Sequence, residues 1–129
     1  MKLKSFIYYW LPVIIYAGVI FYFSSLAQPI PEGGLEFQRK DLLLHAMEYL
    51  VLSALLLRAF LNSSVKKAFV YSILIASAYG ITDEIHQLFV PGRVFSVYDI
   101  LANAFGACLI LLFLFHKNAK SFKTKKGAL

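Results

Sequence analysis

A twelve-residue segment carries most of the side-chain types that acid–base chemistry or ligand recognition requires. The segment at positions 82–93, TDEIHQLFVPGR, holds two carboxylates, an imidazole, an amide and a guanidinium. Such groups can transfer protons, bind polar ligands or coordinate a metal. The rest of the chain is apolar, since 60% of its 129 residues are hydrophobic and 16% are charged. Polar groups in such apolar surroundings are energetically unfavourable unless they are paired with one another. Their concentration in one segment makes it a candidate functional site.

Further polar residues lie upstream and downstream at helical spacing. At 100° per residue, positions i, i+4 and i+7 fall within about 60° of one another on one helix face. Two expected helices have polar stripes at this spacing: Asp41, His45 and Glu48 (with Tyr49 beside them) on one, and Asp99, Asn103 and Gly106 on the other. On a third, Asp83, His86 and Gln87 at i, i+3 and i+4 also form a stripe on one face, with Glu84 on another face.

The elements that must position these stripes are membrane-spanning helices. The mean hydropathy is +0.69, and a run of about 20 apolar residues spans the roughly 30 Å of hydrocarbon. Because lipid offers the backbone no hydrogen-bond partners, spanning segments of this length are helices. We predict a single all-α domain over 1–129, a polytopic membrane protein with four transmembrane helices. The helices are expected at about 6–26, 42–61, 68–86 and 97–115, followed by a basic tail at 116–129.

The distribution of charge predicts the orientation of these helices. Ten of the thirteen basic residues lie at the N-terminus, in the second connection or in the tail. The positive-inside rule then places both termini in the cytoplasm. All seven acids fall in the outer loops or outer helix ends: Glu32, Glu36, Asp41, Glu48, Asp83, Glu84 and Asp99. Basic residues dispersed beside apolar runs suit a membrane surface, so we expect no nucleic-acid partner despite the net charge of +6.

Packing the three stripes against one another is the most economical way to bury them, because an isolated charge facing lipid costs about 2.5 kcal/mol or more. The prediction is an acidic, histidine-bearing pocket that opens to the outside. Its candidate ligand-binding residues are Asp41, His45, Tyr49, Asp83, Glu84, His86, Gln87, Arg93, Asp99 and Asn103. Simpler roles are also open: Asp41 and Asp99 can cap helix starts, and Gly106 can serve close helix packing.

Several kinds of chemistry remain open for this pocket. His45 with Glu48, and Asp83 with His86, have the i, i+3 spacing of bundle metal sites, although the residue order is unusual. We therefore predict no cofactor, with a divalent metal as the less favoured alternative. A serine nucleophile, Ser24 or Ser25, is geometrically conceivable. General acid–base chemistry or headgroup recognition requires only the histidines, the carboxylates and Arg93.

The order and spacing of these residues resemble the VanZ-like family over roughly residues 10–115. The motif residues are Phe23-Ser24-Ser25; Lys40-Asp41, His45 and Tyr49; Asp83-Glu84-Ile85-His86-Gln87; Pro91-Gly92-Arg93; and Asp99, Asn103 and Gly106. Glu48 does not match a family motif. The resemblance implies a multi-pass protein of the bacterial plasma membrane. It also implies an association with low-level resistance to teicoplanin, a lipid-tailed glycopeptide antibiotic that acts at the cell envelope.

Three hypotheses about function follow. In the first, the pocket binds the polar headgroup of a lipid-linked or amphiphilic envelope molecule at the outer leaflet and affects glycopeptide sensitivity. In the second, the chain is an intramembrane hydrolase or transferase acting on lipid-linked precursors, with His45, His86, Asp83 and Asp99 as catalytic candidates. In the third, it is a structural subunit whose polar stripes face a neighbouring protein. The oligomeric state is not predicted.

Overall fold

The computed structural model describes residues 3–27 and 34–112, with the side chains of the second segment described from position 41 onward. This part of the chain is helical, with short connections and no strand. The helices are α1 (Leu3–Ser24), α2 (Gly34–Asn62), α3 (Ala68–Gln87) and α4 (Val97–Cys108). The predicted all-α fold class and the four helices are confirmed.

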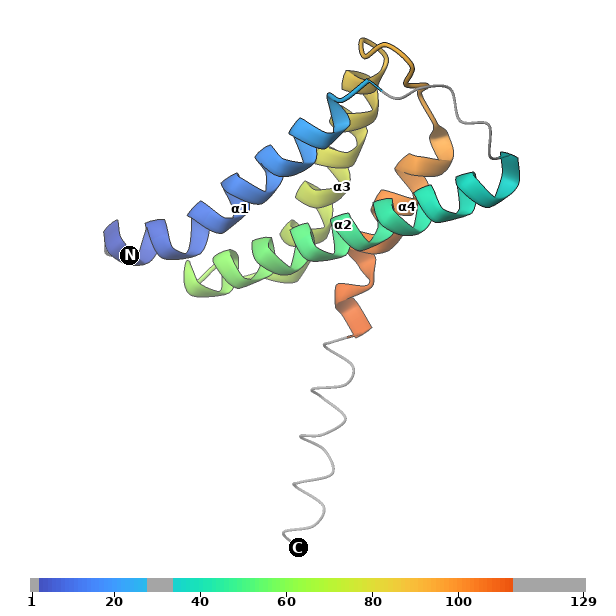
Figure 1. Ribbon diagram of the computed structural model, residues 1–129. Helices are drawn as coiled ribbons and strands as arrows, with labels where there is room; N and C mark the ends of the chain where they lie inside the picture. The colour runs from blue at the N-terminus through green and yellow to red at the C-terminus, as the bar shows by residue number, and fades with distance from the viewer. Residues whose placement is uncertain (1–2, 28–33, 113–129) are drawn as a thin grey trace, which may run out of the picture.

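Helix α2 is central to the arrangement, because it packs against each of the other three helices and most extensively against α4. The chain runs back and forth, so that the end of α1, the start of α2, the end of α3 and the start of α4 lie at the same end of the molecule (Figure 1). Among the described residues, the acids Asp41, Glu48, Asp83, Glu84 and Asp99 lie toward this end. The fold therefore brings the three polar stripes close together.

The crossing of α2 and α4 depends on small residues. A Cβ built on Gly106 would overlap the backbone of Ala46, with the Ala46 carbonyl oxygen as its nearest atom and the Ala46 Cα at 2.7 Å. Nearby, the Ser53 hydroxyl donates to the Ala107 carbonyl oxygen at 3.2 Å. Small residues allow helix backbones to approach closely in lipid. Close helix packing is therefore the role that the structure supports for Gly106.

Helix α1 is joined to the rest of the bundle at two points along its length. The Trp10 indole N–H donates to the Ser63 hydroxyl at 3.2 Å. The Tyr79 hydroxyl of α3 donates to the Ala17 carbonyl oxygen at 2.7 Å. These contacts hold a helix of which most side chains are exposed, so α1 forms one wall of the bundle.

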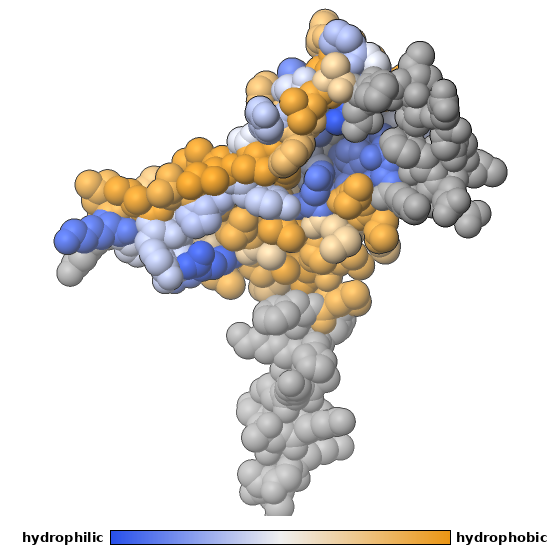
Figure 2. Space-filling model, viewed as in Figure 1, coloured by the Kyte–Doolittle hydropathy of each residue, from blue (hydrophilic) through white to orange (hydrophobic). Residues whose placement is uncertain are grey.

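The outer surface of the molecule suits a bilayer. Large apolar side chains such as Tyr8, Ile14 and Tyr22 on α1 are more than 60% exposed. The helix sides are largely hydrophobic, and hydrophilic residues gather in the space between the end of α1 and the first half of α2 (Figure 2). Three helical segments are long and apolar enough to cross a membrane: Leu3–Ser24, Asp41–Asn62 and Ala68–Gln87. The apolar helix Val97–Leu112 is shorter.

The second helix begins earlier than predicted. We expected its start near position 42, after a loop with prolines and glycines, but α2 begins at Gly34. The residues just before Asp41 are compatible with a helix even though they are too polar for a membrane span. The predicted end of the fourth helix, at 115, lies outside the described residues. The tail at 116–129 lies outside them as well.

Candidate functional site

A cavity of about 350 Å³ lies between α1, α2, α3 and the loop that follows α3. Its lining combines apolar and polar side chains. The apolar residues are Ile20, Phe23, Leu26, Ala27 and Leu44, and the polar residues are Ser24, Asp41, His45, Glu48, Asp83, Gln87 and Arg93. An apolar pocket with a few convergent polar groups is the usual form of a small-molecule site.

Asp83 and Ser24 carry polar atoms that face this cavity without a protein partner. Each residue is 5% exposed. One oxygen of Asp83, Oδ2, accepts a hydrogen bond from Gln87 Nε2 at 3.3 Å. The other oxygen, Oδ1, and the Ser24 hydroxyl have no hydrogen-bond partner among the described residues. Since buried polar atoms are usually paired, two unpaired atoms in residues of the cavity wall are unusual, although both atoms are themselves covered by protein.

Arg93 joins the loop after α3 to the end of α1. Gly92, just before it, has a φ of 79°, in the left-handed region that glycine adopts without strain. This turn directs the guanidinium back across the bundle end. Arg93 Nη2 donates to the Phe23 carbonyl oxygen at 3.0 Å, and Nε to that of Leu26 at 3.4 Å. The Phe23 carbonyl oxygen also accepts from the Leu26 N–H at 3.2 Å, and Leu26 lies just beyond α1. Arg93 therefore lines the cavity and ties the loop after α3 to the end of α1.

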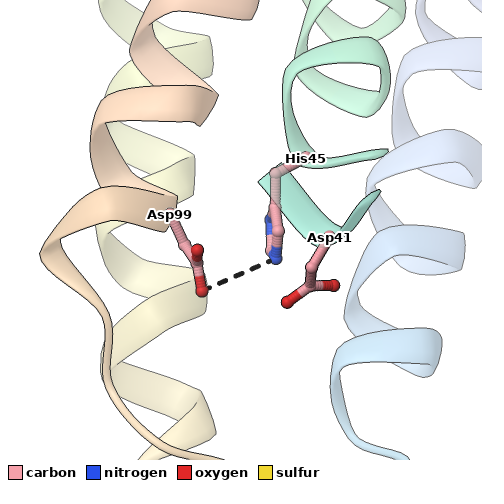
Figure 3. Close-up of side chains that lie close together, drawn as sticks. All are labelled: Asp41, His45 and Asp99. Carbon is pink, nitrogen blue, oxygen red and sulfur yellow. Dashed lines mark ion pairs between the residues drawn. The ribbon is translucent and has the colours of Figure 1, made fainter. Parts of the chain in front are cut away.

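His45, on α2, points toward α4 and lies near the carboxylate of Asp99 (Figure 3). Its Nδ1 lies 3.1 Å from the side-chain oxygen of Asn103. Its Nε2 lies 3.9 Å from Asp99 Oδ2. The Asp41 carboxylate, one turn earlier on α2, completes a group in which one ligand atom per residue lies within 4.8 Å of the others. An imidazole and two carboxylates therefore lie close together here, and Asp99 Oδ2 is the oxygen that lies 3.9 Å from the ring.

His86 does not join this group. It packs against α1, where its ring stacks on Phe21 with centroids 4.4 Å apart and its Nε2 lies 2.9 Å from the Ser25 hydroxyl. The hydroxyl donates its single proton to the Phe21 carbonyl oxygen at 2.6 Å, so His86 is the donor toward Ser25. A histidine that activates a serine must accept its proton. The pair is therefore not arranged as a nucleophile and its base.

Glu84 supports the start of α4. It is fully buried, and its Oε2 accepts a hydrogen bond from the backbone N–H of Ser96 at 3.2 Å. The Ser96 hydroxyl in turn accepts from the Asp99 N–H at 3.2 Å, which makes Ser96 the N-cap of α4. Asp99 is not the N-cap of this helix, because Ser96 holds that position, but it lies in the first turn of α4, where a carboxylate complements the helix dipole. The alternative that Asp41 caps a helix start is wrong, because α2 has already begun seven residues earlier.

Five of the ten predicted binding residues line the cavity, and five lie behind it. Those in the lining are Asp41, His45, Asp83, Gln87 and Arg93. The others surround these residues: Tyr49, Glu84, His86, Asp99 and Asn103. The candidate set omitted Ser24 and Glu48, although both belong to the lining. Glu48 could have been included on spacing alone, since it shares a helix face with His45. The apolar residues of the lining could not be told apart in the sequence from residues that face lipid, because both kinds are hydrophobic.

Tyr49 is fully buried, and its hydroxyl has no hydrogen-bond partner among the described residues. Its ring lies at the meeting point of three helices: a Cβ on Gly80 of α3 would be 3.1 Å from Tyr49 Cε1 and 2.9 Å from Asn103 Cβ. Tyr49 therefore packs beneath the cavity and does not reach it.

The comparisons with known proteins agree with this architecture. A model of the VanZ/LLP1 family matches residues 9–118, which include all four helices from the second turn of α1 onward. Comparison with curated proteins and with solved structures gives no match. The family match includes the whole cavity lining and the group around His45. The chain belongs to the VanZ/LLP1 family and, with its apolar helices, is a membrane protein of that family.

Proposed function

We propose that the cavity binds the polar headgroup of an amphiphilic envelope molecule at the outer leaflet of the bacterial plasma membrane. In this proposal all four helices cross the bilayer and both termini are cytoplasmic. Binding would alter how the cell responds to lipid-tailed glycopeptides such as teicoplanin, in keeping with the role that the family resemblance implies. The proposal narrows the binding residues to those that line the cavity, and gives the residues behind them positioning roles.

The observation that carries the proposal is the mixed lining of the cavity. Leu44, Phe23 and Ile20 offer an apolar wall to an acyl or isoprenoid chain. Asp83 Oδ1 and the Ser24 hydroxyl, which have no partner among the described residues and lie covered at the cavity wall, would offer hydrogen bonds to a headgroup once the wall adjusts to it. An amphiphile that is already dissolved in the bilayer can reach such a site from the side without leaving the membrane.

The charges of the lining define the headgroup chemistry. Asp41, Glu48 and Asp83 are three carboxylates, whereas Arg93 is engaged with the carbonyls of Phe23 and Leu26. Carboxylates accept hydrogen bonds and repel anions. The preferred headgroup is therefore rich in hydroxyl, amide or ammonium donors, as in a sugar or peptide headgroup.

Binding of teicoplanin to the purified protein tests the proposal, with a glycopeptide that lacks a lipid tail as the second probe. We expect saturable binding of teicoplanin and weaker binding of the tailless compound. Replacing Asp83 by alanine removes a hydrogen bond to a charged group, which contributes about 1.5–3 kcal/mol, so affinity is expected to fall about tenfold or more.

The matched control is the neighbouring Thr82→Ala variant. Thr82 is exposed, does not line the cavity and donates to the Tyr79 carbonyl oxygen within its own helix. This variant should bind as the wild type does. Equal affinity of Asp83→Ala and wild type, or the same loss in Thr82→Ala, would contradict the proposed site.

A further inference from the structure

Asp41, His45 and Asp99 form a group that the headgroup proposal does not explain. Asp41 and His45 lie one turn apart on α2, and Asp99 lies in the first turn of α4. Their side chains point toward a common point (Figure 3), with one ligand atom from each within 4.8 Å of the others. The close crossing of α2 and α4 at Gly106 and Ala46 holds the two helices together nearby.

The hydrogen bond from His45 to Asn103 determines which ring nitrogen carries the proton, and the other nitrogen faces the carboxylates. The side-chain oxygen of Asn103 can only accept, so the proton of a neutral His45 resides on Nδ1, 3.1 Å away. Nε2 then presents a lone pair toward Asp99 Oδ2 at 3.9 Å. A metal-ligating histidine commonly donates its other ring N–H to an oxygen in this way, which orients the ring.

A protonated His45 accounts less well for the geometry. An imidazolium would donate to Asp99 in a charge-assisted hydrogen bond of about 2.7–2.9 Å, and the observed separation is 3.9 Å. A cation between these atoms fits better. Bonds of about 2.0–2.2 Å to a Zn²⁺ place its ligand atoms roughly 3–4 Å apart. The separation of His45 and Asp99 falls in this range, whereas the group of three, which extends to 4.8 Å, would have to contract on binding.

We propose that Asp41, His45 and Asp99 bind one divalent transition-metal ion. An imidazole with two carboxylates suits Zn²⁺ or Mn²⁺ better than Mg²⁺ or Ca²⁺, which prefer oxygen ligands alone. Three protein ligands leave a coordination position open. Asp41 and His45 also line the cavity, whereas Asp99 does not, so the proposed site lies at the cavity wall.

A second observation points to a positively charged occupant of the cavity. Asp83 lines the same cavity as Asp41 and His45, is 5% exposed, and its Oδ1 has no partner among the described residues. Three carboxylates thus line one cavity, the buried Asp83 and the half-buried Asp41 and Glu48, and like charges repel more strongly where the dielectric is low. A divalent cation would relieve this repulsion. The site differs from the sequence-predicted pairs, because His86 is engaged with Ser25 and Phe21.

Metal titration of the full-length protein, purified in detergent with a tag free of histidine, tests this inference. The protein is treated with a chelator and titrated with Co²⁺, whose visible absorption reports nitrogen and oxygen ligation, and Zn²⁺ is then added as a competitor. We expect one Co²⁺ per chain, displaced by Zn²⁺. Asp99→Asn, which keeps the side-chain shape, should weaken binding at least tenfold. Asn103→Ala, which leaves the three ligands in place, should weaken it about 10- to 100-fold.

The controls are His86→Ala and Cys108→Ser, since His86 lies outside the group and Cys108 is an exposed thiol on α4. Both variants should retain the wild-type affinity and spectrum. No saturable Co²⁺ binding by the wild type would overturn the inference, and so would undiminished binding by a folded Asp99→Asn variant. Because the titration uses the metal alone, its failure would leave the headgroup proposal standing.

Discussion

Individual polar side chains in this protein are held by one neighbour and leave a second atom available. His45 bonds to Asn103 through Nδ1 and turns Nε2 toward Asp99. Asp83 accepts from Gln87 through one oxygen and leaves the other free of described partners. Such half-satisfied groups are unfavourable in a low-dielectric interior. Their presence at one end of the bundle fits the proposals that a ligand forms hydrogen bonds there and that an ion is coordinated there.

The buried Tyr49 and the half-buried Tyr79 allow this reasoning to be tested residue by residue. The Tyr79 hydroxyl donates to the Ala17 carbonyl oxygen at 2.7 Å, whereas the Tyr49 hydroxyl has no partner in the described structure. Tyr79→Phe is expected to lower the free energy of unfolding by about 1 kcal/mol, through loss of this hydrogen bond. Tyr49→Phe is expected to raise it by about 1 kcal/mol, because an unpaired buried hydroxyl is removed.

Chemical denaturation in mild detergent measures both changes, and each variant serves as the control for the other. A loss of stability in Tyr49→Phe equal to that in Tyr79→Phe would show that the Tyr49 hydroxyl has a stabilising partner in the intact protein.

Among the elements, the α2–α4 pair determines the geometry of the candidate site. Its two halves carry Asp41 and His45 on one side, and Asp99 and Asn103 on the other. The helices can approach closely because Gly106 has no side chain at the point where it meets Ala46. Separation of the two helices by even a methyl group would pull Asp99 and Asn103 away from His45.

Gly106→Ala is therefore expected to destabilise the fold by about 3 kcal/mol, at the upper end of the usual penalty for overpacking. The added Cβ would overlap backbone atoms of Ala46, which cannot move aside as a side chain can. Gly18→Ala in α1 is the matched control, since a Cβ there meets nothing within 4 Å. Thermal unfolding in detergent compares the two variants, and a Gly106→Ala protein as stable as Gly18→Ala would be incompatible with this crossing.

For the whole molecule, the candidate site lies at one end of the bundle, so the orientation in the membrane decides what the site meets. The loop after α3 belongs to this end, and the connection between α2 and α3 belongs to the opposite end (Figure 1). The distribution of basic residues predicts that the site faces outward.

Cysteine labelling in intact cells tests this orientation in a Cys108→Ser background, which has no other cysteine. Val94→Cys, at a position that is 79% exposed in the loop after α3, should react with a membrane-impermeant maleimide. Lys66→Cys, at an exposed position in the opposite connection, should react only after permeabilisation. The reverse pattern would place the cavity in the cytoplasm and exclude an outer-leaflet ligand.

The helices and the polar end of the bundle could be predicted from the sequence, because both depend on local composition. An apolar run must be helical in lipid wherever it lies, and acids gathered near helix ends must meet when those ends meet. The start of α2 at Gly34 was missed for a related reason: hydropathy reports where a helix enters hydrocarbon, whereas the backbone can become helical several residues before.

The choice of partners could not be predicted, because it depends on how each helix is rotated and how closely it approaches its neighbour. Spacing placed His86 beside Asp83, yet the packing of α3 on α1 turns this histidine toward Ser25. Spacing alone could not assign Asp99 to His45 either, since they lie 54 positions apart and meet across a contact that Gly106 permits. One-dimensional periodicity identifies the face of a helix on which a side chain lies. The group that this face meets is set by the three-dimensional fit of two surfaces.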